Sequence, residues 1–242
     1  MTRTAIITGA SRGIGAAIAR RLASDGLAVV INYARSHEEA DAVVRTIIER
    51  GGHAVAAQAD LADAGAVRAL FDVAEQQFGG VDVLVNNAAV MTLAPIAETT
   101  DEMFERMLAA NLRGTFRGMR EAARRLREGG RIINFSSSVV GLYPPTYGAY
   151  AATKAAIEAM THIAAKELGS RRVTVNTVAP GPTATALFLD GKSESQVEAF
   201  KRGNPQGRLG EPDDIAATVA FLASPAAQWI SGQTIRVNGG VV

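Results

Sequence analysis

The feature that most constrains the fold is an alternation of two kinds of segment along nearly the whole chain. Short runs rich in β-branched residues are separated by longer stretches, rich in Ala, Arg and Glu, whose apolar residues recur with a helical period. Several of the short runs are continuously apolar, as is typical of strands buried on both faces of a sheet. The seven predicted strands are Thr4–Thr8, Ala28–Tyr33, His53–Gln58, Val81–Asn86, Arg131–Phe135, Val173–Val178 and Thr234–Val237. The alternation predicts an α/β fold with a doubly wound (Rossmann-type) seven-stranded parallel sheet and helices on both faces.

We expect a single domain that spans residues 1–242. The 242 residues fit one large α/β domain, and no linker rich in Pro, Gly or Ser and no internal repeat divides them. With 48% hydrophobic and 20% charged residues, the composition excludes wholesale disorder. The one irregular stretch is Pro180–Gly210, which has two interpretations: a short helical excursion that covers a cleft, or an ordinary surface connection.

Charge and composition exclude several classes of function. The 25 Lys and Arg residues balance 24 Asp and Glu residues, so the net charge of +1 leaves no excess for a nucleic-acid backbone or an anionic membrane. The chain has no cysteine, and its three histidines (His37, His53, His162) lack ligand spacing, so no metal site is expected. No signal-peptide pattern and no run of about 18 apolar residues is visible, which favours the cytoplasm as the location.

A glycine-rich turn follows the first predicted strand. The segment Thr8-Gly9-Ala10-Ser11-Arg12-Gly13-Ile14-Gly15 lies between that strand and a predicted helix. Glycines at these positions let the backbone turn tightly and approach a pyrophosphate, which then meets the N–H groups and positive dipole end of the helix. A plain tight turn is the alternative, and the strand before it and helix after it favour nucleotide binding.

Together with motifs farther along the chain, this turn resembles the short-chain dehydrogenase/reductase family, and most of all its 3-oxoacyl-carrier-protein reductase branch. The resemblance covers nearly all 242 residues. The motifs that carry it are Thr8-Gly-x-x-x-Gly-x-Gly15, Asp60-Leu61, Asn86-Asn87-Ala88-Ala89, Asn111, the serines at 136–138, Tyr150-Ala-Ala-Thr-Lys154, Pro180-Gly181 and Val237-Asn238-Gly239-Gly240. One departure is Ala89, where the family usually has glycine, so the local fit beside the cofactor ribose is in question.

The end of the second predicted strand bears on the choice of nicotinamide cofactor. An acidic residue there would bind the ribose 2′-hydroxyl of NAD and repel a 2′-phosphate. Here no acid precedes Glu38, whereas Arg12, Arg35 and Ser36 are placed to converge on a phosphate. We therefore expect NADP(H), although solvated surface arginines and an NAD(H)-dependent alcohol or sugar dehydrogenase are the alternatives.

The resemblance implies a cofactor site built from several turns. Asp60 would contact the adenine, or would instead cap a helix that starts at Ala62. The turn at Pro180-Gly181 would seat the carboxamide end of the nicotinamide, with the Thr183 and Thr185 hydroxyls as candidates for the amide and the phosphates. The expected contacts are Gly9, Ser11, Arg12, Gly13, Ile14, Gly15, Asn32, Tyr33, Ala34, Arg35, Ser36, Ala59, Asp60, Leu61, Asn87, Ala88, Ala89, Tyr150, Lys154, Pro180, Gly181, Thr183 and Thr185.

Tyr150 and Lys154 are four residues apart in a predicted helix, Gly148–Leu168, so they project from one face. A phenol titrates near a pKa of about 10, and a fixed ammonium nearby favours the phenolate and lowers that pKa. The family resemblance implies that Lys154 also holds the nicotinamide ribose. Taken alone, the pair fits a packed tyrosine beside a solvated lysine better than a catalytic pair.

Serines at the end of a strand 13 residues upstream favour the catalytic interpretation. A hydroxyl there can donate to a carbonyl oxygen while Tyr150 delivers the proton. Spacing selects Ser137, whereas the Val-Val-Gly that follows selects Ser138, and we choose Ser137. Asn111 lies in a predicted helix that begins near Thr100. By resemblance it holds a water that links the lysine to solvent, and the alternative is an internal cap of helix backbone groups.

These residues predict an NADP(H)-dependent oxidoreductase that reduces a ketone to a secondary alcohol, or the reverse, with a 3-oxoacyl thioester as one candidate substrate. The alternative from a different functional class is a protein that binds a nucleotide but catalyses no reaction. The predicted apolar pocket wall is Leu142, Tyr143, Tyr147, Leu187 and Phe188.

Two kinds of partner are expected besides the small-molecule carbonyl or alcohol. A group of arginines is a candidate docking surface for an acidic acyl carrier protein, or else a set of solvated charges: Arg124, Arg125, Arg127, Arg171 and Arg172. By resemblance the chain forms a homotetramer through the helices that bear Asn111 and Tyr150 and through the C-terminal strand. The Ala151, Ala155 and Ala159 face permits close helix approach, between subunits or within one.

Overall fold

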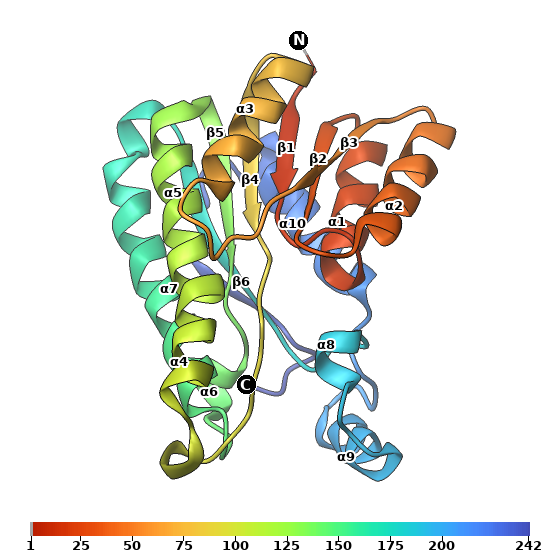
Figure 1. Ribbon diagram of the computed structural model, residues 1–242, viewed down its shortest axis with the longest axis vertical. Coiled ribbons are helices and arrows are strands. Elements are labelled where there is room, and N and C mark those ends of the chain that lie inside the picture. The colour runs from red at the N-terminus through yellow and green to blue at the C-terminus, as the bar shows by residue number, and fades with distance from the viewer. Residues whose placement is uncertain (1) are drawn as a thin grey trace.

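The computed structural model describes residues 2–242 as a seven-stranded parallel sheet in the order β3-β2-β1-β4-β5-β6-β7. The expected fold class is confirmed (Figure 1). The strands are β1 (Thr4–Ile7), β2 (Ala28–Tyr33), β3 (His53–Gln58), β4 (Val81–Asn86), β5 (Leu126–Phe135), β6 (Thr174–Pro180) and β7 (Thr234–Val237).

The helices that connect the strands cover both faces of the sheet. They are α1 (Gly13–Ser24), α2 (His37–Glu49), α3 (Ala66–Phe78), α4 (Asp101–Met107), α5 (Gly114–Arg125), α6 (Val139–Leu142), α7 (Gly148–Glu167), α8 (Ala186–Leu189), α9 (Glu194–Gly203) and α10 (Pro212–Ala223). Shorter turns are η1 (Ile96–Glu98), η3 (Gly169–Arg171) and η4 (Pro225–Ala227), and η2 (Leu108–Arg113) is a π-helical segment between α4 and α5.

Four strands have the predicted bounds, and the others differ at their ends. β1 ends at Ile7 rather than Thr8, β6 runs from Thr174 to Pro180, and α7 ends one residue early at Glu167. The largest difference is β5, which begins at Leu126 rather than Arg131. Its first part is polar and glycine-rich, and it pairs with β4 through a register irregularity at Val81/Val83, so no apolar run marks it in the sequence.

Alternation of side chains along the strands produces two cores. On one face, strand residues such as Ile7 and Val85 pack with α1, α2 and α10. On the other, Ile6 and Leu84 pack with α3, α5 and α7. The central strands β1, β2 and β4 are covered on both sides, which explains why their sequences are almost continuously apolar.

The strand order reverses between β1 and β4. At this point, side-chain hydrogen bonds join the segments that follow the two strands. The Thr8 hydroxyl accepts hydrogen bonds from the backbone N–H groups of Asn87 and Ala88, both at 3.0 Å. The Asn87 amide in turn donates to the carbonyl oxygens of Thr8 and Gly9. In open α/β sheets ligands bind beyond the carboxyl ends of the strands at such a reversal, so this edge is the place to look for a site.

The irregular stretch Pro180–Gly210 contains α8 and α9 and lies beyond this edge of the sheet (Figure 1). Its side chains Leu187, Phe188 and Phe200 line a cleft, so the helical-excursion interpretation is confirmed. No helix within residues 2–242 combines the length and apolarity that a membrane crossing requires.

A buried polar network joins α7 to the sheet. The Thr161 hydroxyl accepts from Asn134 Nδ2 at 2.9 Å and from the Thr177 hydroxyl at 2.8 Å, and it donates to the Ile157 carbonyl. Asn134 also accepts from Asn86 Nδ2 at 2.8 Å. These bonds connect β4, β5, β6 and α7, so the network fixes where α7 lies on the sheet.

We predict that Thr161→Val lowers the free energy of unfolding by about 2 kcal/mol, because Asn134 and Thr177 lose their partner while the side-chain shape is kept. Thr46→Val is the matched control, since Thr46 makes the same bond to the carbonyl four residues earlier on the solvent side of α2. Urea unfolding of both variants measures the difference. Equal losses would contradict a special role for the buried network.

Candidate active site

The predicted site residues come together at one edge of the sheet. They follow the carboxyl ends of β1, β2, β3, β4 and β6, which parallel strands bring to the same side. The groups are residues 9–15 after β1, 32–36 at the end of β2, 59–61 after β3, 87–89 after β4 and 180–185 at the end of β6. The fold therefore brings these predicted groups to one edge of the sheet.

The glycine turn after β1 is built for close approach. Gly9 and Gly13 have φ of 62° and 54°, and a Cβ at Gly15 would lie 2.4 Å from the Gly9 carbonyl oxygen. No side chain caps the start of α1, where Arg12 is the capping residue. Backbone N–H groups of the first turn are thus free of side-chain partners, as a phosphate-binding turn requires.

Asn32 and Tyr33 were expected to contact the cofactor. In the structure, their side chains instead form hydrogen bonds with other residues of the chain. Asn32 is buried, accepts from Gly9 N–H at 3.2 Å, and donates to the Ala57 and Ala59 carbonyl oxygens. The buried Tyr33 makes a 2.8 Å hydrogen bond with His37 Nδ1. Asn32 thus ties the glycine turn to the ends of β2 and β3, so its side chain shapes the site from behind.

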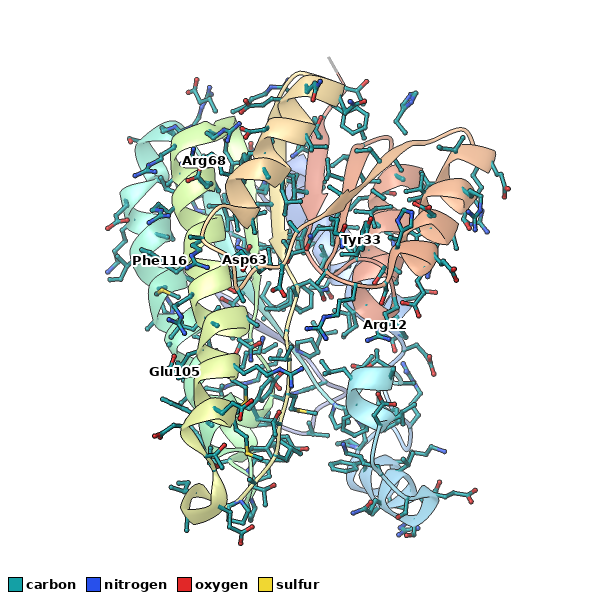
Figure 2. All side chains as sticks on the ribbon, in the orientation of Figure 1. Arg12, Tyr33, Asp63, Arg68, Glu105 and Phe116 are labelled. Atoms are coloured by element: carbon teal, nitrogen blue, oxygen red, sulfur yellow. The ribbon has the colours of Figure 1, made fainter. Side chains whose placement is uncertain are left out.

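Polar side chains lie around the turn after β2, on the same side of the molecule as Arg12 and Tyr33 (Figure 2). Arg12, Arg35 and Ser36 are exposed or half-buried, and one Arg12 nitrogen is 4.0 Å from a Glu39 carboxylate oxygen. This is a weak, solvated ion pair that leaves both arginines open to an anion.

The helix-cap alternative for Asp60 is wrong. Asp60 Oδ1 does accept from the Ala62 N–H at 3.0 Å, but α3 begins only at Ala66, with Gly65 before it. Asp60 closes a tight turn after β3 instead. This turn brings Leu61, which is buried, under α5.

A cleft of about 510 Å³ opens at this edge. The expected wall residues Leu142, Tyr147, Leu187 and Phe188 line it, but Tyr143 does not. Tyr143 has a φ of 46° and is 70% exposed, because the αL conformation after α6 turns its ring outward. The wall residues that were missed include Met91, Phe200 and Val241, and no motif marks these three.

Tyr150 and Lys154 both line the cleft, and both are buried on α7. Lys154 Nζ donates to the Phe135 carbonyl at the end of β5, at 2.9 Å, and lies 5.5 Å from the centre of the Tyr150 ring. Burial lowers the pKa of Lys154 to about 8. The alternative of a solvated lysine is therefore wrong.

The expected lowering of the Tyr150 pKa is also contradicted. Burial raises the pKa of Tyr150 well above its usual value, the hydrogen bond with Ser137 opposes this rise, and Tyr147 adds to it. The Lys154 ammonium points to the Phe135 carbonyl and lies near the ring instead of acting on the phenol oxygen. The spacing predicted the pair correctly, but it could not reveal how strongly burial disfavours the phenolate.

The structure separates the two competing serines. The Ser137 side chain is within hydrogen-bonding reach of the Tyr150 phenol. Ser138 is buried, donates to the Ala179 carbonyl and accepts from Asn238 Nδ2 at 3.0 Å. Ser137 therefore is the one beside Tyr150, whereas Ser138 ties β5 to the C-terminal segment.

Asn111 lies within the helix that follows Thr100, in the π-helical segment η2, and is fully buried. Its amide is not an internal helix cap. Its side chain accepts from the Val90 N–H at 2.8 Å, donates to the Val90 carbonyl at 2.9 Å, and reaches Thr153 on α7. Asn111 thus fixes the segment after β4 against α7.

The turn after β6 closes the far side of the cleft, and Pro180, Gly181, Thr183 and Thr185 all line it. Gly181 has no room for a side chain, since a Cβ there would lie 2.7 Å from the Asn238 side chain. The Thr185 hydroxyl caps α8, and a Cβ at Gly13 would lie 3.3 Å from its methyl group. A side chain at position 13 would therefore fill the space between the glycine turn and Thr185.

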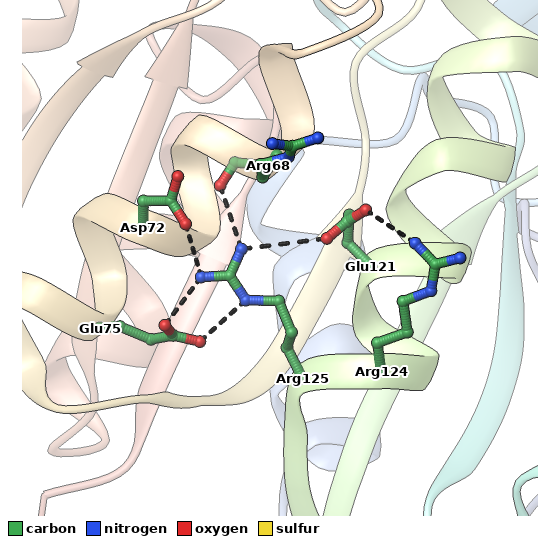
Figure 3. A network of polar contacts seen from close by, with 6 residues as sticks. All are labelled: Arg68, Asp72, Glu75, Glu121, Arg124 and Arg125. Atoms are coloured by element: carbon green, nitrogen blue, oxygen red, sulfur yellow. Dashed lines mark hydrogen bonds and ion pairs between the residues drawn. The ribbon is translucent and has the colours of Figure 1, made fainter.

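Each member of the arginine group has a partner within the chain, but the Arg124 and Arg172 side chains stay 66% and 77% exposed, so the docking surface stays a prediction. Arg125 binds Glu75 and Asp72 at 2.7 Å (Figure 3). Its guanidinium also lies over the Phe71 ring. Arg124 is 3.6 Å from Glu121. The others pair with Asp82 (Arg127), Glu128 (Arg172) and the carbonyl oxygens of Ala123 and Leu126 (Arg171).

Comparison with known proteins agrees with this geometry. Residues 9–242 match the family model described as enoyl-(acyl carrier protein) reductase. A short-chain type dehydrogenase/reductase of Picea abies is 47% identical, covering 99% of this chain and 92% of its own length. NADPH-dependent aldehyde reductase 2 of Arabidopsis thaliana is 45% identical (98% and 93%), and the 3-oxoacyl-[acyl-carrier-protein] reductase of Staphylococcus aureus 43% (100% and 98%).

Solved structures give the same result. A dehydrogenase/reductase from Sinorhizobium meliloti superimposes with a TM-score of 0.95 at 42% identity, covering 100% of this chain and 96% of that one. The angucycline C-6 ketoreductase LanV with bound NADP gives 0.94 at 40% identity, covering 99% and 95%. The chain belongs to the short-chain dehydrogenase/reductase family.

The buried lysine makes stability depend on pH. Between pH 8 and pH 10 the unfolded chain keeps a proton on Lys154 that the folded chain has lost, because the pKa falls from 10.5 to about 8 on folding. Unfolding therefore becomes harder as pH rises. From pH 7.5 to 9.5 we expect wild type to gain about 2 kcal/mol relative to Lys154→Met in urea unfolding. Parallel pH dependences of the two proteins would contradict a buried, titrating amine.

Proposed function

We propose that this protein is an NADP(H)-dependent reductase that converts a ketone to a secondary alcohol, or the reverse. The observation that carries the proposal is that Ser137, Tyr150 and Lys154 line one cleft together with Ile14 of the glycine turn. A nucleotide-binding protein without chemistry would need the glycines but not this set.

The roles follow from where each group lies. NADPH, when bound, would supply the hydride. Tyr150 gives the proton to the carbonyl oxygen, and Ser137 donates a hydrogen bond to that oxygen as negative charge develops. Lys154 holds the nicotinamide ribose and the positive charge beside the phenol. Asn111 keeps the Val90 segment in place and orders the water that links Lys154 to solvent.

Several features fit the cofactor and favour the phosphorylated form. The uncapped start of α1 suits the pyrophosphate, Arg12 of the glycine turn and Arg35 after β2 are both exposed, and no acid follows β2 before Glu38. The Arabidopsis relative is an NADPH-dependent reductase, and LanV was solved with NADP. A free carboxylate at the end of β2 would have favoured NAD instead.

The walls of the cleft favour an apolar or aromatic carbonyl compound. A second hollow of about 600 Å³ shares Met91, Tyr147, Leu187 and Phe200 with the first and continues outward to Lys192. This length would accept an extended substrate. The Staphylococcus relative makes a 3-oxoacyl thioester a candidate, and the exposed Arg124 and Arg172 are candidates for contact with an acidic acyl carrier protein.

We also propose a homotetramer, in the cytoplasm. Apolar side chains are exposed on the outer sides of α5 and α7, where Phe116 is 49% and Ile163 56% exposed. Ala155 and Ala159 on α7 are exposed as well, so this small-residue face does not pack within the subunit. A second helix could approach it closely.

We predict that Tyr150→Phe lowers kcat by about 10²- to 10⁴-fold, the usual contribution of a general acid, while NADPH still binds. Ser137→Ala should cost about 10²- to 10³-fold, as for a lost donor to a developing oxyanion. Ser138→Ala is the matched control, with a much smaller effect. The loss of NADPH absorbance with a panel of acyl thioesters, diketones, quinones and sugar ketones measures the kcat of each variant. Undiminished turnover by Tyr150→Phe would exclude the mechanism.

A second prediction concerns the cofactor. Arg35→Ala should weaken NADPH binding by about 10- to 100-fold, which corresponds to one charge-assisted hydrogen bond, and leave NADH binding unchanged. Arg50→Ala, at the far end of α2, is the control and should change neither. Fluorescence titration with both nucleotides distinguishes the outcomes. An equal loss for NADH and NADPH would mean that Arg35 does not recognise the 2′-phosphate.

A further inference from the structure

The end of β5 and α7 are joined by a third contact beside those of Lys154 and Tyr150. The Ser136 hydroxyl donates to Glu158 Oε1 at 2.6 Å, and it lies 3.4 Å from the Lys154 carbonyl oxygen. Ser136 is 3% exposed. Sequence reasoning gave Glu158 no role, because a glutamate on an amphipathic helix is ordinarily a solvated side chain.

The three contacts form a regular series. Tyr150, Lys154 and Glu158 are spaced by four residues, so they lie along one stripe of α7. Their partners are three consecutive residues at the end of β5, namely Phe135 for Lys154, Ser136 for Glu158 and Ser137 for Tyr150. Ser136 is therefore flanked on both sides by residues that hold the reacting groups.

This geometry couples Glu158 to the reacting groups without touching them. Among residues 2–242, Glu158 makes no ion pair. Within the same residues, its side chain forms a hydrogen bond with Ser136. A hydroxyl that donates to a carboxylate forms a stronger bond than one between neutral groups. If the end of β5 moved relative to α7, the Phe135 carbonyl and the Ser137 hydroxyl would move with it.

We propose that Glu158 is a positioning residue for the reaction: by accepting the Ser136 hydroxyl, its carboxylate holds the end of β5 against α7 and so fixes Lys154 and Tyr150 relative to Ser137. This inference rests on the proposed function and adds to it a residue that contacts neither substrate nor cofactor.

Four variants test the bond by kinetics: Glu158→Ala, Glu158→Gln, Ser136→Ala and the double variant Ser136→Ala/Glu158→Ala. We expect Glu158→Ala to lower kcat by about 10- to 100-fold, the size of effect that small misplacements produce. Glu158→Gln should retain most of the activity, because its amide oxygen still accepts from Ser136. The double variant should be no worse than the worse single one, since both remove the same bond. Glu167→Ala, an exposed glutamate at the end of α7, is the matched control.

A second readout does not need turnover. NMR titration of ¹³C-labelled lysine reports Lys154, whose pKa burial lowers to about 8. We expect the Lys154 pKa to rise toward its usual value in Glu158→Ala and in Ser136→Ala, because water reaches the loosened ammonium, and to stay near the wild-type value in Glu158→Gln.

The outcomes separate the two proposals. Wild-type kcat and lysine titration in Glu158→Ala, additive losses in the double variant, or a Glu158→Gln variant as impaired as Glu158→Ala would each overturn the positioning role. If wild type reduces no ketone, the proposed function fails, and the lysine titration alone decides whether Glu158 positions the pair. Should Glu158→Ala be unfolded at the assay temperature, Ser136→Ala removes the same bond with a smaller change of volume.

Discussion

The burial of one lysine ammonium at the end of β5 is the constraint on which the rest of the site depends. A buried charge is costly unless polar groups compensate it, and Lys154 has a carbonyl oxygen and an aromatic ring beside it. No carboxylate among residues 2–242 forms an ion pair with it. The fold therefore maintains a strained electrostatic arrangement at this point, which is typical of functional sites.

The sheet provides the geometry that this arrangement requires. Parallel strands bring five turns to one edge, and the reversal of strand order between β1 and β4 opens the place where they meet. Side chains behind the site fix each turn: Thr8 and Asn87 join the turns after β1 and β4, and Asn32 joins the glycine turn to β2 and β3. The Thr161 network fixes α7 in turn. The positions of the site residues therefore depend on the hydrogen bonds that hold these turns and α7 in place.

The sequence predicted the fold and the site residues well where local signals exist. The alternation of short strand-like runs with helical stretches predicted the bounds of β2, β3, β4 and β7, and four-residue spacing placed Tyr150 beside Lys154. Prediction failed where tertiary contacts decide. The start of β5 has no apolar run, the acids that pair with Arg125 and Arg127 come from distant segments, and the Tyr150 pKa depends on burial that spacing does not reveal. Glu158 was missed because its partner, Ser136, is distant in sequence.

The central claim is that the cleft passes a hydride to a carbonyl carbon while Tyr150 protonates the oxygen. Mass spectrometry of the alcohol formed from a ketone and NADPH deuterated at nicotinamide C4 tests this most directly. We expect one deuterium on the carbinol carbon, from one of the two C4 epimers only, and labelling about 10²- to 10⁴-fold slower with Tyr150→Phe. Unlabelled alcohol, or equal labelling by both epimers, would contradict direct transfer within this cleft.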